Sequence, residues 1–211
     1  MNQTKIKLYG HELSGNVYKV RLLLALLDIE YQFVRIDVMK QEQKSAEYLK
    51  LNPFGQIPLL VDGDKIIPDA QAILVYLACQ YGNEQWLPIE AEALSRVVRW
   101  LSTTTGEIRQ GVESARLFYL FKAKTVDINI ATQKSTFILE QIDRHLADRE
   151  WLELGHPTIA DIAAFPYIAL APDGKISLKQ YPHILAWIER IKQLPKFRGM
   201  PGIDSPTIVP V

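Results

Sequence analysis

The stretch Asn52-Pro53-Phe54-Gly55-Gln56-Ile57-Pro58-Leu59-Leu60 places a proline at the start of an apolar segment that predicts a β-strand over residues 57–61. Proline has no N–H and gives a strand no ladder donor at that point. Pro58 is therefore either an ordinary strand-start proline or the second residue of a cis peptide bond. A cis bond would turn the backbone of Ile57 outward, where its N–H and C=O could pair with an extended, peptide-like ligand.

Around this stretch, the first eighty residues alternate between strand and helix patterns. Apolar spacing predicts a helix that starts at Asn16, and Asp62-Gly63-Asp64 predicts a hairpin turn. The predicted strands cover residues 5–9, 31–36, 57–61 and 65–67, and the later helices cover 41–51 and 69–81. A βαβ unit, a helix and a ββα unit together predict one mixed four-stranded sheet covered by helices.

The remainder of the chain has helical periodicity throughout, and it predicts an all-α domain. Predicted helices lie around residues 94–108, 128–146, 159–170 and 184–194, before a proline-rich, irregular tail over 195–211. The predicted domains are residues 1–80 and 89–211, joined by a linker over 81–88. We expect the main ligand cleft between the two domains, which is a usual place for one.

Composition excludes several classes of function. The 211 residues carry 24 basic and 24 acidic side chains, and this zero net charge argues against nucleic acid or an anionic membrane as the main partner. Cys79, the one cysteine, cannot form an intrachain disulfide, and we expect it to be a buried apolar side chain. The four histidines show no metal-ligand spacing. With no signal-peptide or membrane-span pattern, we expect a cytoplasmic protein without a metal.

Ser14 and Asn16 lie where the first predicted strand passes into the first helix. One interpretation is capping, because Ser and Asn satisfy the free N–H groups of a helix start. The other is chemical, since a hydroxyl, an amide and the helix dipole would together favour an anion such as a thiolate. Thr158-Ile159-Ala160-Asp161 has the spacing of a capping box, and here we predict a purely structural role.

Four stretches of the sequence resemble cytosolic glutathione transferases. Gln56-Ile57-Pro58-Leu59-Leu60 and Pro68-Asp69-Ala70-Gln71-Ala72-Ile73-Leu74-Val75-Tyr76-Leu77 resemble that family's thioredoxin-like domain. Pro157-Thr158-Ile159-Ala160-Asp161-Ile162-Ala163 resembles its helical C-terminal half, and Ser14-Gly15-Asn16-Val17-Tyr18-Lys19-Val20 is similar to its bacterial or cyanobacterial members. The resemblance implies an α/β thioredoxin-like domain followed by an all-α domain, in a homodimer.

The resemblance also assigns roles to residues. Ser14 would stabilise the thiolate of bound glutathione, with Asn16 as a supporting donor and Tyr9, at the end of the first strand, as second choice. Glutathione itself would be held by Gln56, Ile57, Pro58, Asp69, Ala70 and Gln71. From their spacing in the chain, we expect Lys44 and Gln43 to reach its glycine carboxylate from the second predicted helix. Family members usually carry Ser where this chain has Ala70, so one hydroxyl contact to glutathione is missing.

The second substrate should be electrophilic and largely apolar, and its pocket is predicted from position in the chain. Candidates for its lining are His11, Leu13, Thr104, Ile108 and Gly111, with ordinary packing as the alternative for each. The predicted activity is conjugation of the glutathione thiolate to small electrophiles, as in detoxification. A glutathione-dependent disulfide reductase or peroxidase on the same scaffold is one alternative. A non-catalytic binding module, which Ala70 favours, is the other.

Overall fold

The structure, a computed structural model, describes residues 6–204 of the chain. Its N-terminal part contains β1 (Ile6–Gly10), α1 (Gly15–Leu26), β2 (Gln32–Arg35), the 3₁₀ helix η1 (Glu42–Lys44), α2 (Ala46–Leu51), β3 (Leu59–Asp62), β4 (Lys65–Pro68) and α3 (Ala70–Tyr81). The strands form one sheet in the order β2-β1-β3-β4. β1 pairs with β2 in parallel, and the other two pairs are antiparallel. The predicted mixed four-stranded sheet is confirmed.

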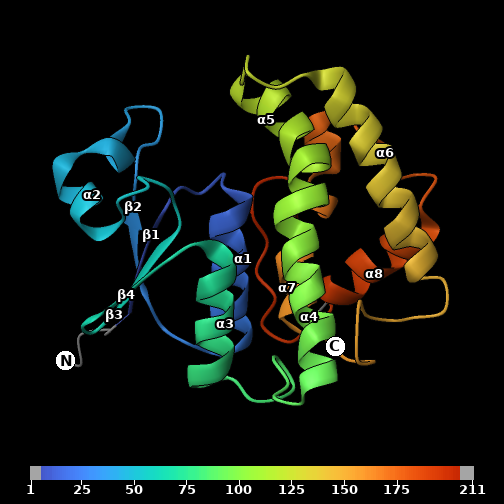
Figure 1. The fold of residues 1–211 in the computed structure, drawn as a ribbon, viewed down its shortest axis with the longest axis horizontal. Coiled ribbons are helices and arrows are strands. Elements are labelled where there is room, and N and C mark those ends of the chain that lie inside the picture. The colour runs from blue at the N-terminus through green and yellow to red at the C-terminus, as the bar shows by residue number, and fades with distance from the viewer. Residues whose placement is uncertain (1–5, 205–211) are drawn as a thin grey trace, which may run out of the picture.

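Helices cover both sides of this sheet. α1 and α3 lie side by side on the face toward the rest of the molecule, and α2 lies on the opposite side (Figure 1). Leu8 and Leu60, which face each other across β1 and β3, are fully buried with Val17 and Leu74 from the two helices. The carboxyl end of the central strand β1 and the first turn of α1 therefore lie at the end of the sheet nearest the helical part.

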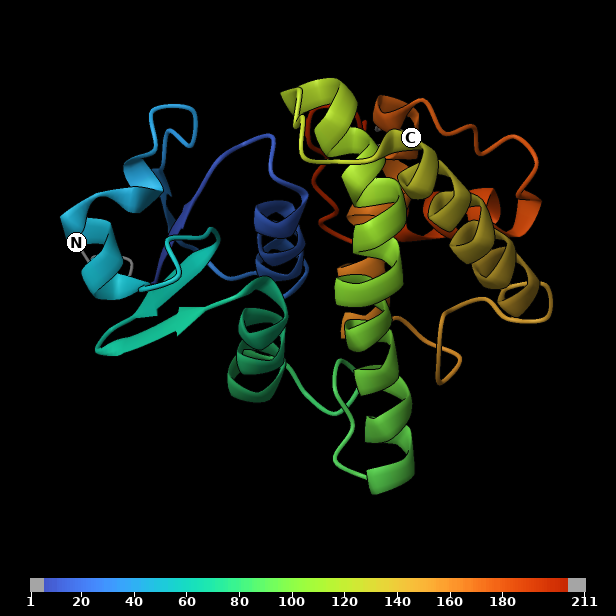
Figure 2. The ribbon, with the colours of Figure 1, turned by 45° about the horizontal axis from the view of Figure 1, so that its top comes forward.

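The C-terminal part is helical. It contains α4 (Ala91–Thr103), the π-helix η2 (Thr104–Glu113), α5 (Ser114–Phe121), α6 (Ile128–His145), α7 (Ile159–Ala169), the 3₁₀ helix η3 (Ala171–Gly174) and α8 (Pro182–Lys192). α4, η2 and α5 follow one another as a single long rod beside the N-terminal part (Figure 2). α7 packs against α1, α3, α4 and η2, and every residue from Ile159 to Ile168 is buried.

Two predicted helices differ from the structure. The helix predicted over 41–51 is divided into η1 and α2 by Ser45, whose backbone is extended. The Ser45 side chain accepts a hydrogen bond from the Tyr48 N–H and so caps the start of α2. The helix predicted over 94–108 continues as far as Phe121, with a π-helical middle. The predicted capping box is confirmed, because Thr158 and Asp161 each bond the backbone of the other at the start of α7.

The described part of the tail packs back onto the N-terminal part. The Tyr18 hydroxyl in α1 donates to the carbonyl of Arg198 at 2.7 Å, and Met200 and Ile203 form an isolated bridge. The predicted irregular tail therefore holds as far as residue 204, and Pro206 and Pro210 lie outside the described residues. None of the helices within residues 6–204 combines the length and the apolar character needed to cross a lipid bilayer.

Candidate active site

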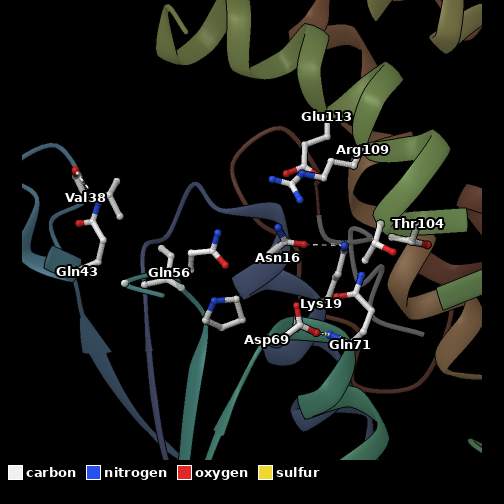
Figure 3. Close-up of a pocket in the computed structure, with 15 residues that line it drawn as sticks. Asn16, Lys19, Val38, Gln43, Gln56, Asp69, Gln71, Thr104, Arg109 and Glu113 are labelled. Atoms are coloured by element: carbon white, nitrogen blue, oxygen red, sulfur yellow. Dashed lines mark hydrogen bonds between the residues drawn. The ribbon is translucent and has the colours of Figure 1, made fainter. Parts of the chain in front are cut away.

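A polar cavity of about 300 Å³ lies between the N-terminal part and the long rod. Residues from α1, from the loop before β3, from the start of α3 and from η2 all face it (Figure 3). Its lining consists of Asn16, Lys19, Val38, Gln43, Gly55, Gln56, Ile57, Pro58, Asp69, Ala70, Gln71, Thr104, Thr105, Arg109 and Glu113. Such a mixture of donors, acceptors and charges suits a polar, extended ligand.

A second cavity of about 310 Å³ adjoins the first and is more apolar. It is lined by His11, Ser14, Asn16, Val38, Met39, Ile57, Glu113, Arg116, Leu117, Phe121 and Tyr167. Asn16, Val38, Ile57 and Glu113 line both cavities, so the two meet beside the first turn of α1. We refer to them below as the polar cavity and the apolar cavity.

Ser14 and Asn16 begin α1 at this junction. Ser14 is the N-cap, and its Oγ accepts a hydrogen bond from the Val17 N–H at 3.3 Å, which leaves the hydroxyl hydrogen available to a ligand. The Oδ1 atom of Asn16 accepts from Lys19 Nζ at 2.7 Å, so its amide nitrogen is the group left for other partners. The helix dipole adds to the two donors, and the three together favour an anion.

The loop before β3 presents unpaired backbone to the polar cavity. The peptide bond between Ile57 and Pro58 is cis, as one of the two sequence interpretations requires. The Gln56 carbonyl just before it accepts from the Tyr48 hydroxyl and from Asn52 Nδ2, both at 2.8 Å, which fixes the loop on α2. Within residues 6–204, no hydrogen bond uses the N–H or C=O of Ile57, so both remain available to a ligand.

The start of α3 forms the far end of the polar cavity. Asp69 is its N-cap and accepts from the N–H groups of Gln71 at 2.9 Å and Ala72 at 3.1 Å. Its φ of 75° is unusual for a residue other than glycine, and such conformations concentrate at functional sites. Ala70 is buried and has no side-chain donor, so the helix N-terminus offers only main-chain N–H groups here.

The π-helix η2 brings charged side chains to the same cavity. Thr104 and Glu113 are nine residues apart, which is two and a half turns of an α-helix and would place them on opposite faces. The wider i to i+5 spacing of a π-helix makes nine residues about two turns. Thr104, Arg109 and Glu113 therefore share one face, and all three line the polar cavity.

A cluster of buried charges lies beneath the junction of the cavities. Lys19 is 1% exposed and Glu113 is 7% exposed. Burial lowers the pKa of Lys19 to about 8, although Glu113 and Asp69 oppose this shift. Burial also raises the pKa of Glu113, against the attraction of Lys19 and Arg109. Tyr167 in α7 interacts with Glu113 and with the backbone of Asn16, and burial raises the pKa of its hydroxyl well above the ordinary value.

Several residues predicted for the site lie elsewhere. Lys44 is exposed, and its Nζ donates to the Phe54 carbonyl at 2.9 Å, so Gln43 lines the polar cavity instead. Tyr9 lines neither cavity, because its ring packs edge-on against Tyr48 with the ring centroids 6.3 Å apart.

The residues predicted for the electrophile pocket do not all line the apolar cavity. His11 lines the apolar cavity, but Thr104 lines the polar one. Ile108 is fully buried in the core, and Gly111 allows close packing, since a Cβ there would lie 2.8 Å from the Ser135 nitrogen. Leu13 contributes only its carbonyl, which accepts from Arg116 Nη1 at 3.0 Å.

Sequence reasoning missed Lys19, Glu113 and Tyr167 as site residues. α1 lies between the sheet and α7, so most of its residues are buried. The apolar periodicity of α1 predicts that Lys19 faces solvent, but α7 covers that side of the helix. The spacing of Lys19 three residues after Asn16 was the available signal, because side chains at i and i+3 meet on a helix.

Cys79 also differs from its prediction. The thiol is exposed rather than buried, because Leu77 and Ala78 occupy the buried face of α3 and Cys79 is one residue beyond it. Cys79 does not line either cavity. Among the described residues, no group of three or more His, Cys, Asp or Glu side chains could hold a metal ion.

Known proteins resemble this chain over nearly its whole length. The family model for the N-terminal domain of glutathione S-transferase matches residues 4–79, and the model for the C-terminal domain matches residues 115–195. Glutathione S-transferase 3 of Zea mays is 31% identical, over 92% of this chain and 91% of its own.

Solved structures agree with these matches. The crystal structure of a glutathione S-transferase from Pseudomonas fluorescens superposes with a TM-score of 0.88 at 28% identity, covering 93% of this chain and 98% of that one. A glutathione transferase homologue from Drosophila mojavensis, solved with bound glutathione, gives 0.83 at 31% identity, covering 92% and 90%. The two-part fold, the sheet topology and the two family models lead to one conclusion: the chain belongs to the glutathione S-transferase family.

Proposed function

We propose that the protein is a glutathione transferase that adds the thiolate of glutathione to small, largely apolar electrophiles. The observation that carries this proposal is the meeting of a polar and an apolar cavity at the first turn of α1. The polar cavity would hold glutathione, whose bound form in the Drosophila mojavensis homologue supports this assignment. The apolar cavity would hold the electrophile beside the sulfur.

Binding would use the free main chain of the site. The N–H and C=O of Ile57 would pair with the cysteinyl part of glutathione, as an added strand pairs with a sheet edge. Asp69 and the first N–H groups of α3 would hold the γ-glutamyl end, with Gln71 beside them. Gln43 and Gln56 line the opposite end of the cavity, where the glycine carboxylate would lie.

Catalysis would consist of keeping the sulfur ionised. A thiol has a pKa near 8.5 and is mostly protonated at neutral pH. A hydrogen bond from the Ser14 hydroxyl, one from the Asn16 amide and the α1 dipole would stabilise the thiolate. Since about 1.4 kcal/mol corresponds to one pKa unit, these contacts could lower the thiol pKa by one to two units. The ionised sulfur then attacks the electrophile directly.

The test is a rate measurement with glutathione and a panel of aryl halides, isothiocyanates and hydroxyethyl disulfide. We expect turnover of the first two classes and at least a tenfold lower rate for Ser14→Ala. Ser45→Ala is the matched control, because Ser45 caps α2 in the same way, with its Oγ 3.2 Å from the Tyr48 nitrogen, but lies outside both cavities. An unchanged rate in Ser14→Ala would remove Ser14 from the chemistry.

The same panel separates the alternatives. Turnover of hydroxyethyl disulfide alone would indicate a disulfide reductase. Retention on immobilised glutathione with no turnover would indicate a binding module, the alternative favoured by Ala70. We further propose a homodimer working in cytoplasmic detoxification, which rests on the family resemblance; light scattering of the purified protein tests the oligomeric state, and a monomer would refute it.

A further inference from the structure

Lys19 is a buried lysine in a position where charge is costly. It lies on α1 between the sheet part and α7, and it is 1% exposed. Removing an ammonium from water is unfavourable unless the fold gives it specific partners. Among the described residues, its Nζ donates to Asn16 Oδ1 at 2.7 Å and lies 4.9 Å from the centre of the Tyr167 ring. Both partners belong to the site, so the charge is directed there.

The bond from Lys19 decides which end of the Asn16 amide faces the ligand. An asparagine amide has an acceptor oxygen and a donor nitrogen that differ little in shape. Because Lys19 can only donate, it selects Oδ1, and the Nδ2 atom then points away from it (Figure 3). With the amide reversed, Asn16 would present oxygen lone pairs to an anionic sulfur and repel it.

Charged groups from every neighbouring element hold Lys19 in its protonated form near neutral pH. Glu113 on η2 and Asp69 at the start of α3 attract the ammonium, whereas Arg109 on η2 opposes it. Tyr167 on α7 contributes the face of its ring. Glu113 also interacts with Tyr167, which ties α7 to the same cluster.

We propose that Lys19 is a positioning residue that makes Asn16 a donor to the glutathione sulfur. The inference rests on the proposed function of this site. Lys19 acts through Asn16 and does not touch the reacting atoms. Its removal frees the amide to rotate, so that the oxygen can face the sulfur, and this weakens the stabilisation of the thiolate.

The test measures the thiol pKa of bound glutathione, by ultraviolet absorbance of the thiolate, in the wild type, Lys19→Met, Asn16→Ala and the double variant. We expect Lys19→Met to raise this pKa by about one unit and to lower kcat/KM at pH 6.5 about tenfold. In the Asn16→Ala background, the same change should have less than a twofold effect. Arg21→Met is the control, since it removes a cation from α1 outside both cavities.

Additive effects of the two substitutions would overturn the proposal, because Lys19 would then act independently of Asn16. An unchanged thiol pKa in Lys19→Met would do the same while leaving the transferase function intact. The binary titration needs no electrophile, so it still tests Lys19 if no conjugation is found. Should Lys19→Met fail to fold, Asn16→Asp keeps an oxygen for Lys19 but loses the donor. Its thiol pKa should exceed that of Asn16→Ala, and a value equal to the wild type would refute the inference.

Discussion

Arg116→Met tests whether the helical part holds the catalytic loop in place. Arg116 in α5 is 2% exposed, and it donates from Nε to Asp173 at 2.9 Å and from Nη1 to the Leu13 carbonyl at 3.0 Å. Leu13 directly precedes Ser14, so this guanidinium joins the C-terminal part to the residue that we expect to meet the thiol. Methionine removes both bonds while filling most of the volume.

The expected cost follows from those two bonds. Hydrogen bonds to charged groups contribute about 1.5–3 kcal/mol each, and an orphaned buried carbonyl costs about 1–3 kcal/mol. The Asp173 side chain is 30% exposed and regains water when Arg116 is lost, so the loss lies toward the lower end of the combined range. We expect a decrease of about 3–4 kcal/mol in the free energy of unfolding. We also expect a fall in kcat/KM of tenfold or more, because the loop before Ser14 is no longer held.

Urea unfolding and steady-state kinetics measure the two effects. A double-mutant cycle with Asp173→Asn isolates the ion pair from the bond to the loop. Arg96→Met serves as control, because Arg96 pairs with Glu92 on the exposed face of α4, where such a pair contributes at most about 0.5 kcal/mol. If Arg116→Met unfolded within 0.5 kcal/mol of the wild type and kept its kcat/KM, the loop would not depend on this contact.

Further predictions concern the N-terminus of α3, the core, the buried lysine and the free thiol. Ala70→Ser should lower the dissociation constant for glutathione about two- to twelvefold, measured by calorimetry, because it adds one hydrogen bond of about 0.5–1.5 kcal/mol. Weaker binding would contradict this. Asp161→Ala should cost about 3 kcal/mol or more in urea unfolding, since Asp161 accepts from two backbone N–H groups at 3.0 Å and from the Trp187 indole at 2.9 Å. A loss of only about 1 kcal/mol would mean that Asp161 acts as a helix cap alone. Burial lowers the pKa of Lys19 to about 8, so the folded protein binds fewer protons than the unfolded chain above that pH. Stability should therefore rise from pH 8 to 10 in the wild type relative to Lys19→Met, and parallel curves would refute this. Cys79 should react with iodoacetamide, as seen by mass spectrometry, without loss of activity; inactivation would place the thiol in the mechanism.

Local signals in the sequence predicted the parts of the site that local structure creates. Ser14 and Asp69 begin helices, and a helix start is defined by its own first turn. Pro58 indicated that the main chain of Ile57 could turn outward, because a cis peptide bond before proline acts on the two adjacent residues alone. The sheet followed from period-two strands and a hairpin turn.

The remaining parts depend on contacts between segments that are distant in the sequence. Glu113 and Tyr167 reach α1 only because α7 packs against both α1 and η2, and no spacing within either segment reveals this. Lys44 is the reverse case. Its position in the chain predicted a contact with glutathione, but its Nζ donates to the carbonyl of Phe54. The change from α to π geometry after Thr103 also altered which side of the rod each later residue occupies.

The widened segment of the rod has a consequence for how this protein can be changed. Deleting one residue between Thr104 and Glu113 would let the rod close into regular α-helix, a change that strengthens most helices. Yet eight residues of α-helix turn by about 800°, against about 720° for nine residues of the π-helix. Everything beyond the deletion would therefore swing by roughly 80° about the axis, carrying the carboxylate of Glu113 away from Lys19. A more regular rod would thus be obtained at the expense of one wall of the polar cavity.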